Sequence, residues 1–201
     1  MYTLHKLFPT PILQFKFSKH NNYYFPDIEK SEKIPKDWKC SINTSYPSIN
    51  ADDLFIKKYE RDSLKKELLE EVKLMFSNAG MPTDIAFNDM FWYNVYHESQ
   101  GQERHNHLGN CNTSIFWSGI YYNKNASPTI FYPTSALYKT NKFIGYENSI
   151  LSDCYFDHVK INVSDGDVIL FPAYLDHEVI LEKNFKDRMR LTFAFNIILC
   201  Q

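Results

Sequence analysis

The sequence predicts a mainly β protein, a double-stranded β-helix (a jelly-roll or cupin-like barrel) with one or more N-terminal helices packed outside it. Aromatic and β-branched runs, separated by turn residues, fill the second half of the chain. A single helical pattern stands in the first half. Hydrophobic residues make up 44% of the 201 residues, enough for one sizeable core. We expect a single domain over 1–201, with a strand, loops and a supporting helix in 1–88 and the jelly-roll catalytic core in 89–201.

The N-terminal part predicts a strand, then loops, then one helix. Residues 11–17 alternate loosely between polar and apolar side chains, as a strand does. Residues 21–50 are polar and interrupted by prolines, which favours loops and turns. The helix is expected from about 53 to 79, and Gly80 followed by Pro82 ends it. Its apolar stripe consists of Leu64, Leu68, Val72, Met75 and Phe76.

The remainder of the chain is typical of strands. The expected strands cover residues 90–96, 113–122, 129–132, 155–163, 167–171, 178–181 and 189–199. So many strands with no helix between them favour a double-sheet jelly roll or a similar barrel. Residues 133–153 have a weak pattern. A lid that contacts substrate and a solvent-exposed insertion are equally consistent with that segment.

Composition excludes some classes of function. The formal net charge of −2 gives no electrostatic reason to expect binding to nucleic acid or to an anionic membrane. The cysteines form no C-x-x-C pair and indicate free thiols in a reducing compartment; they are Cys40, Cys111, Cys154 and Cys200. We find no secretory signal and no run long enough to span a bilayer, so a cytoplasmic, soluble protein is expected.

Three histidines suggest a metal site. His105 and His107 lie one residue apart, so on an extended strand both would point to the same face. His177 comes from a distant segment, shortly after a predicted strand ends in Phe171–Pro172. Three imidazoles would leave part of the coordination sphere open, as a catalytic metal requires. Chance spacing of histidines is the alternative, although the position of His177 at a strand end favours a metal.

A second group of residues is cationic and hydroxylated. On the last predicted strand, Arg188, Arg190 and Thr192 share one face. An arginine that points into a barrel is unfavourable unless it meets an anion, and its guanidinium matches a carboxylate. Ser118 and Tyr122 share a face of another strand and could help to hold that carboxylate. An ordinary half-buried tyrosine and a surface ion pair of Arg188 remain alternatives, and the choice between the two arginines stays open.

These motifs, taken in order, resemble the 2-oxoglutarate/Fe(II)-dependent dioxygenases, specifically the prolyl-4-hydroxylase-like branch of phages and marine bacteria. The matching segments are residues 7–12, 92–95, 102–107, 117–122, 166–172, His177 and 190–196. They span most of the chain and are densest after residue 92. The ordered series H-x-H, S-G-x-Y-Y, G-D-x-x-x-F-P, H and R-x-T is far more specific than any one piece.

The resemblance implies a set of roles. His105 and His177 would bind Fe(II), and Arg190 with Thr192 would bind the distal carboxylate of the co-substrate 2-oxoglutarate. Tyr122 and Ser118 would assist. The position that usually carries the aspartate ligand is occupied by His107, which we retain as the third ligand. Glu103 is a second candidate for that role, because it lies two positions before His105.

The implied activity is hydroxylation of an aliphatic C–H bond with O2, and a prolyl residue in a peptide is one candidate substrate. The partners would be O2 and a peptide or small molecule, with no nucleic acid and no membrane. A homodimer and a phage-encoded origin in a bacterial host are further expectations. Two alternatives stay open: a three-histidine cupin-like dioxygenase that does not use 2-oxoglutarate, and a non-catalytic barrel that acts as a binding module.

Overall fold

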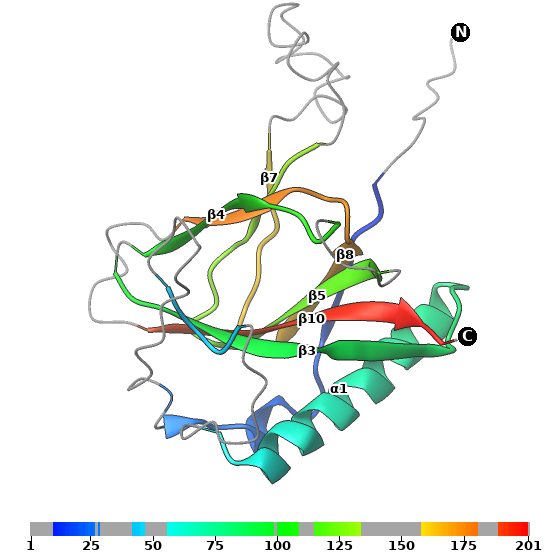
Figure 1. Ribbon diagram of the computed structural model, residues 1–201, viewed down its shortest axis with the longest axis horizontal. Helices are drawn as coiled ribbons and strands as arrows, with labels where there is room; N and C mark the ends of the chain where they lie inside the picture. The colour runs from blue at the N-terminus through cyan, green and yellow to red at the C-terminus, as the bar shows by residue number, and fades with distance from the viewer. Residues whose placement is uncertain are drawn as a thin grey trace, which may run out of the picture.

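Two antiparallel sheets form the body of the protein and face one another in the computed structural model (Figure 1). The structure describes residues 10–26, 28, 42–46, 56–98, 100–108, 115–133, 158–180 and 189–200. The larger sheet has the strand order β1-β8-β5-β10-β3-β2, and the smaller sheet has the order β4-β9-β6-β7. This arrangement confirms the predicted double-stranded β-helix.

The strand bounds agree with most of the predicted runs. The larger sheet consists of β1 (Leu13–Lys16), β2 (Asn43–Thr44), β3 (Ile85–Tyr96), β5 (Ile115–Lys124), β8 (Asp167–Pro172) and β10 (Arg190–Leu199). The smaller sheet consists of β4 (Gly101–His105), β6 (Ile130–Phe131), β7 (Val159–Lys160) and β9 (His177–Ile180). The short strand β2 was not predicted, and β7 is much shorter than expected. Most of the segment 133–153, for which a lid and an exposed insertion were both considered, lies outside the described residues, from residue 134 onward.

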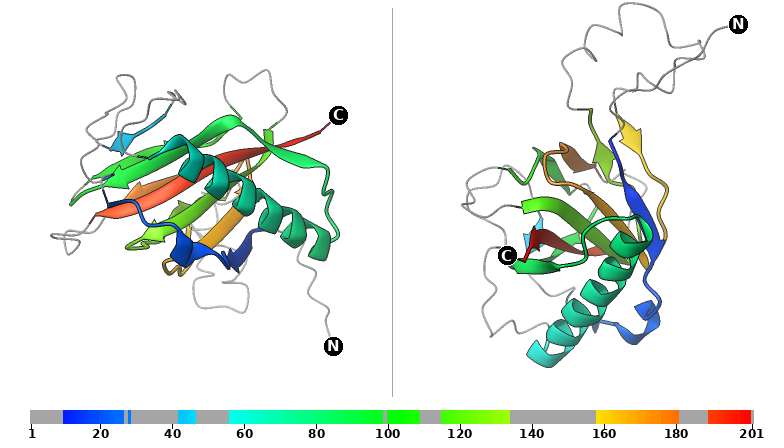
Figure 2. Two further views of the ribbon diagram at one scale, coloured as in Figure 1. Left: turned by 90° about the horizontal axis from the view of Figure 1, so that it is seen from below. Right: turned by 90° about the vertical axis from the view of Figure 1, so that its right-hand side faces the viewer.

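The predicted helix is α1 (Lys58–Asn78), and a short 3-10 helix, η1 (His20–Asn22), precedes it. Seen from below, α1 lies across the outer face of the larger sheet (Figure 2). Its buried side chains recur every four residues: Leu64, Leu68, Val72 and Phe76. The Phe76 ring meets Trp117 of β5 with 5.6 Å between ring centroids. No helix among the described residues is both long and apolar enough to cross a membrane.

Strand alternation divides the larger sheet into two faces. On β10, Leu191, Phe193 and Phe195 belong to the hydrophobic cluster that α1 covers. The intervening residues Arg190 and Thr192 therefore point toward the smaller sheet, and both are buried. The outer face thus supplies most of the apolar core, whereas the inner face carries buried polar groups.

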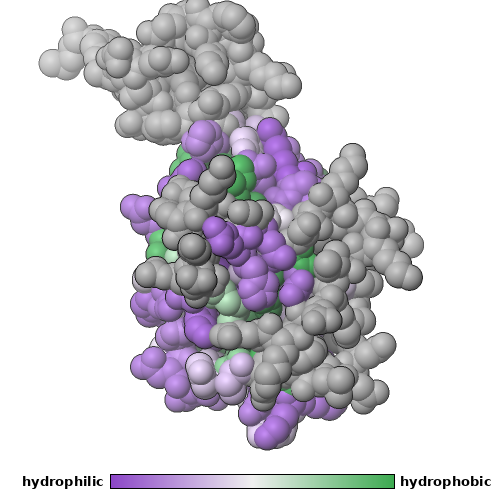
Figure 3. Space-filling model, turned by 90° about the vertical axis from the view of Figure 1, so that its left-hand side faces the viewer, coloured by the Kyte–Doolittle hydropathy of each residue, from purple (hydrophilic) through white to green (hydrophobic). Residues whose placement is uncertain are grey.

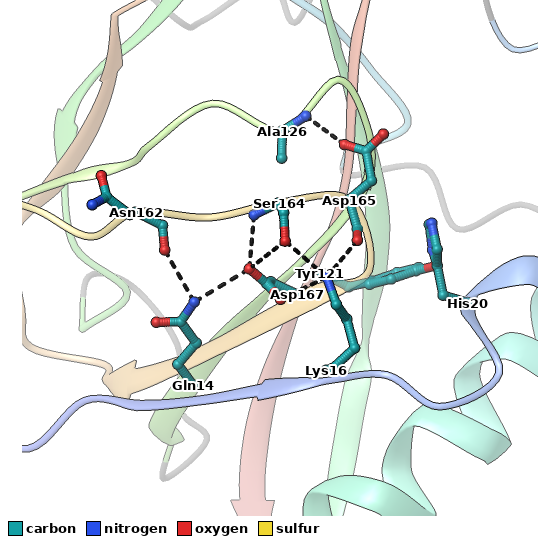
Figure 4. A network of polar contacts seen from close by, with 9 residues as sticks. All are labelled: Gln14, Lys16, His20, Tyr121, Ala126, Asn162, Ser164, Asp165 and Asp167. Atoms are coloured by element: carbon teal, nitrogen blue, oxygen red, sulfur yellow. Dashed lines mark hydrogen bonds and ion pairs between the residues drawn. The ribbon is translucent and has the colours of Figure 1, made fainter.

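The N-terminal strand is bound to the sheet by a polar network around Asp167 (Figure 4). The carboxylate accepts hydrogen bonds from Gln14 Nε2 at 3.2 Å and from the Ser164 backbone N–H at 2.7 Å. It also forms an ion pair with Lys16 Nζ at 3.0 Å. Gly166 sits in the same turn with a φ of +91°, a conformation that favours glycine. This network stabilises β1 at the edge of the larger sheet.

Viewed from the left of Figure 1, the described surface is mainly hydrophilic, with hydrophobic side chains visible in small separate areas (Figure 3). Where the described residues are visible on this face, their hydrophobic side chains form no broad area. Its polarity agrees with the near-neutral, mixed charge of the sequence.

Leu68→Ala should lower the free energy of unfolding by about 2–5 kcal/mol, because it leaves a cavity between α1 and the sheet. Leu74 is the matched control, since it lies on the same helix with 55% of its surface exposed. Leu74→Ala should change the stability by less than about 0.5 kcal/mol. Urea denaturation of both variants measures the difference, and equal midpoints would contradict the packing of α1 on the sheet.

Candidate metal centre

Three histidines converge between the two sheets. His105 ends β4 and lies directly opposite His177, the first residue of β9, in the antiparallel register. His107 follows just after β4, and its backbone N–H donates to the Ala173 carbonyl at 2.9 Å. Each imidazole offers one nitrogen, and these three atoms lie within 4.8 Å of one another. The predicted convergence is present, although His107 lies beyond the strand that was expected to carry it.

Hydrogen bonds set the tautomer of each ring. Every Nδ1 faces an oxygen: Glu103 O for His105 at 2.8 Å, Leu175 O for His177 at 3.0 Å and Asn196 Oδ1 for His107 at 2.5 Å. Because a carbonyl oxygen only accepts, each Nδ1–H must be the donor. The lone pair therefore resides on Nε2 in all three rings. Histidines that bind metals are usually oriented in this way.

Burial keeps the three imidazoles neutral. It is the largest cause that lowers the pKa of each ring, and a positive charge on a neighbouring ring would lower the pKa of His107 and His177 further. The pKa of His107 falls to about 4, and that of His177 lies well below its usual value. None of the three Nε2 atoms therefore carries a proton near neutral pH, so each can serve as a metal ligand, and that of His105 accepts a hydrogen bond from Gln102 Nε2 at 3.3 Å.

Residues next to the histidines join β4 to β9 on the outside. Arg104 donates to Asp176 Oδ2 from Nε at 3.0 Å and from Nη2 at 2.9 Å. Asn106 Nδ2 donates to Asp176 Oδ1 at 2.8 Å. Asp176 thus points away from the three rings. Because Arg104 and Asn106 flank His105 while Asp176 adjoins His177, these bonds hold the two histidine-bearing segments together.

Glu103 does not belong to the ligand group. Its side chain is exposed, and the β4–β9 pairing shifts register between Gln102 and His105. The shift interrupts the alternation on which the i−2 expectation was based. Gln102 lines the cavity instead, with its Nε2 at 3.3 Å from His105 Nε2 and its Oε1 accepting from Tyr96 Oη at 3.0 Å.

Arg190 shares this cavity with the three histidines. It is 1% exposed, and its guanidinium carbon lies 4.6 Å from the Tyr96 ring centroid and 5.4 Å from that of Tyr122. Nη2 donates to Thr129 Oγ1 at 3.3 Å, whereas Nε and Nη1 have no partner among the described residues. A buried cation with two nitrogen atoms that lack a hydrogen-bond partner fits a ligand that carries a carboxylate.

The other predicted anion-binding residues divide between two places. Thr192 lines the cavity, and Tyr122 Oη donates to Thr129 Oγ1 at 2.9 Å, next to Arg190. Ser118 lies elsewhere: its hydroxyl donates at 2.8 Å to Asn196 Oδ1, the same atom that accepts from His107. Arg188 lies outside the described residues. Sequence reasoning missed Thr129 and Asn196, although both are polar residues within or beside predicted strands.

Comparisons with known proteins agree with this geometry. The family model of the 2OG-Fe(II) oxygenases matches residues 90–196, more than half of the chain. A search of curated proteins gave no match.

Solved structures share the fold at low sequence identity. A Pseudomonas putida prolyl-4-hydroxylase aligns with a TM-score of 0.55 and 9% identity, covering 96% of this chain and 94% of its own. HygX from Streptomyces hygroscopicus, solved with nickel, 2-oxoglutarate and hygromycin B bound, aligns with a TM-score of 0.59 and 15% identity, and the alignment covers 94% of this chain and 83% of HygX. AviO1 from Streptomyces viridochromogenes aligns with a TM-score of 0.53 and 13% identity, and the alignment covers 85% of this chain and 77% of AviO1. With the family match over the sheets that carry the histidines and Arg190, the chain belongs to the 2-oxoglutarate- and Fe(II)-dependent oxygenases.

Proposed function

We propose that His105, His107 and His177 hold the Fe(II) of this oxygenase, while Arg190 and Thr192 hold the distal carboxylate of 2-oxoglutarate. The reaction is hydroxylation of an aliphatic C–H bond. One observation carries the assignment: two unpaired nitrogen atoms of a buried arginine share a cavity with the Nε2 atoms of three histidines. A metal ion and a dicarboxylate together satisfy both sets of groups.

Iron with 2-oxoglutarate and O2 supplies the oxidising chemistry when bound, and the residues of the chain bind and orient the reactants. Arg190 lies in a region of low dielectric constant, where its attraction to a carboxylate is strong. Tyr122 and Arg190 both donate to Thr129 Oγ1, which limits the orientations of the guanidinium. In the same way, Asn196 Oδ1 and the backbone carbonyls of Glu103 and Leu175 limit the orientations of the imidazoles.

The three-histidine set changes the charge of the site. A carboxylate at position 107 would neutralise part of the charge of a divalent ion, whereas the imidazole of His107 does not. The cavity therefore presents a cationic metal at one end and the guanidinium of Arg190 at the other. That distribution favours a dianion such as 2-oxoglutarate over a neutral ligand.

The substrate is an organic molecule with an oxidisable C–H bond, and a prolyl residue in a peptide is one candidate. The fold shared with a prolyl-4-hydroxylase is compatible with a peptide, and the fold shared with HygX is equally compatible with a small molecule. The unpaired Nε and Nη1 atoms of Arg190 favour a 2-oxoglutarate-dependent oxygenase over a cupin-like dioxygenase that does not use 2-oxoglutarate and over a non-catalytic binding module. A single domain over 1–201, a cytoplasmic setting, a phage origin and a homodimer stay predictions.

His177→Ala should weaken Fe(II) binding by more than about 100-fold, because it removes one of three ligands. Anaerobic titration with Fe(II) measures the affinity. His97→Ala serves as the control, since His97 lies outside the ligand group, and it should bind as the wild type does. Unchanged affinity in His177→Ala would refute the metal assignment.

Asn196→Leu should weaken metal binding by about 10–100-fold, because the Nδ1–H of His107 loses its acceptor. Ser118→Ala is the matched control: it removes the other hydrogen bond to the same amide oxygen and leaves the bond to His107 in place. The same titration compares the two variants. If both bind metal equally well, Asn196 does not orient His107.

Arg190→Met should bind Fe(II) normally and lose about 2–5 kcal/mol of 2-oxoglutarate binding free energy. The measurement is the charge-transfer absorption that appears when the keto acid chelates Fe(II) without O2. Arg61→Met, on the distant helix α1, should behave as the wild type. Metal-dependent turnover that survives in Arg190→Met without 2-oxoglutarate would favour the cupin-like alternative.

A further inference from the structure

A histidine on the outer side of the larger sheet is joined to a buried hydroxyl group. His20 begins η1, and its Nδ1 lies 2.7 Å from Tyr121 Oη of β5 (Figure 4). His20 is half-buried, whereas Tyr121 has 0% of its surface exposed. Tyr121 belongs to the hydrophobic cluster that α1 covers, on the face of β5 opposite to that of Tyr122. The pair is therefore separate from the metal centre.

A third residue sets the direction of this hydrogen bond. Asn123 Nδ2 donates to the backbone carbonyl of Tyr23 at 3.1 Å, and a carbonyl oxygen only accepts. The same Nδ2 lies 3.1 Å from Tyr121 Oη, so the hydroxyl oxygen must accept from it. The hydroxyl hydrogen of Tyr121 is then directed to His20 Nδ1. His20 consequently needs a lone pair on Nδ1, which makes it neutral with its proton on Nε2.

The surroundings of His20 favour the neutral ring. Burial is the largest cause that lowers the pKa of His20. Of the nearby charges, Asp165 in the turn before β8 raises the pKa, while Lys16 of β1 lowers it. From α1, the carboxylate of Glu67 pairs with Lys19 Nζ at 3.2 Å rather than with the imidazole.

A proton on Nδ1 is incompatible with the hydrogen bonds around Tyr121. Two N–H groups, from His20 and Asn123, would then point at the hydroxyl oxygen, and the O–H of Tyr121 would have no acceptor among the described residues. Because Tyr121 is buried, solvent water cannot replace that acceptor, and an unpaired buried hydroxyl is destabilising. The charged ring is therefore stabilised by leaving this position for solvent.

The segment that carries His20 closes one end of the apolar core. Phe17 precedes η1 and Phe25 follows it, and their side chains are 1% and 6% exposed. The Phe17 ring meets that of Tyr121 with 5.3 Å between centroids, and Phe25 meets Phe193 of β10 at the same distance. If this segment leaves the sheet, both rings lose their cover.

We propose that His20 and Tyr121 form an acid-sensitive latch, which holds residues 17–25 on the sheet while His20 is neutral and releases them when His20 gains a proton. The acid form then presents the apolar side chains of Phe17 and Phe25 at this end of the molecule. Because folding lowers the pKa of His20 below its usual 6.5, the stability contributed by the latch is fully present above that value. It is lost as the pH falls through the lower pKa of the folded state. The latch is independent of the proposed function, since neither residue lines the metal cavity.

The first test compares the Tm of the wild type with that of Tyr121→Phe, which keeps the ring and removes the hydroxyl group. The wild type should have the higher Tm at about pH 8, and the difference should shrink as the pH falls to about 5. Every other titrating group is common to both proteins, so it largely cancels in the difference. Tyr24→Phe is the control, because Tyr24 is 71% exposed, and it should match the wild type throughout. A difference that stays constant with pH would overturn the latch.

The second test observes the tautomer of His20 by long-range ¹H–¹⁵N spectroscopy of the full chain. His20→Gln identifies the signals of His20 among the seven histidines. At about pH 8, Nδ1 should be unprotonated and Nε2 protonated, the opposite of the tautomer in the three histidines of the metal centre. In Tyr121→Phe, the titration midpoint of His20 should move upward. A proton on Nδ1, or an unchanged midpoint in the variant, would rule the proposal out.

The third test measures release of the segment by hydrogen exchange, corrected for the intrinsic dependence of exchange on pH. The reporters are the backbone N–H groups of Phe17 and Tyr23, which donate to Gly166 O at 2.8 Å and His20 O at 3.1 Å. Between about pH 7.5 and about pH 5.5, their protection should fall several-fold in the wild type, while that of α1 is retained. Equal protection at both pH values, or an equal loss in α1, would show that no local latch opens.

Discussion

The antiparallel pairing of β4 with β9 sets His105 opposite His177, and the rest of the site is arranged around that pair. The bonds from Arg104 and Asn106 to Asp176 hold the two segments together on the outside, while the rings meet on the inside. A metal site needs ligands that are already oriented before the ion arrives, because each ring that must be ordered on binding costs entropy. Here hydrogen bonds to backbone carbonyls and to Asn196 hold the three rings in place before any ion binds.

Stability and function reside on opposite faces of the larger sheet. The outer face is apolar and covered by α1, so hydrophobic burial there supplies much of the folding free energy. The inner face carries Arg190, Asn94 and Trp92, whose unpaired polar atoms oppose folding. The core beneath α1 offsets that cost. Unpaired polar groups that gather in one cavity are typical of a binding site, where ligands complete the hydrogen bonding.

Charge gives the cavity its selectivity. Neutral imidazoles, a buried guanidinium and no carboxylate in the ligand group leave the site electropositive once a divalent metal is present. A dianionic co-substrate neutralises this charge from both ends.

The sequence by itself determined the fold class, the helix and which histidines and arginine meet between the sheets. Alternation assigned Arg190 and Thr192 to one face and Phe193 to the other, and H-x-H followed by a distant His177 indicated a metal centre. These features are local or periodic, so a single chain segment reveals them.

Only the tertiary structure decided which neighbours complete the site. The register shift in β4 directs Gln102 into the cavity and leaves Glu103 exposed. Cross-strand pairing brings Ser118 to Asn196 and away from Arg190, and it places Thr129 under the guanidinium. Periodicity states which residues of one strand share a face, but bulges and the partners of that face arise from long-range pairing, which no local pattern encodes.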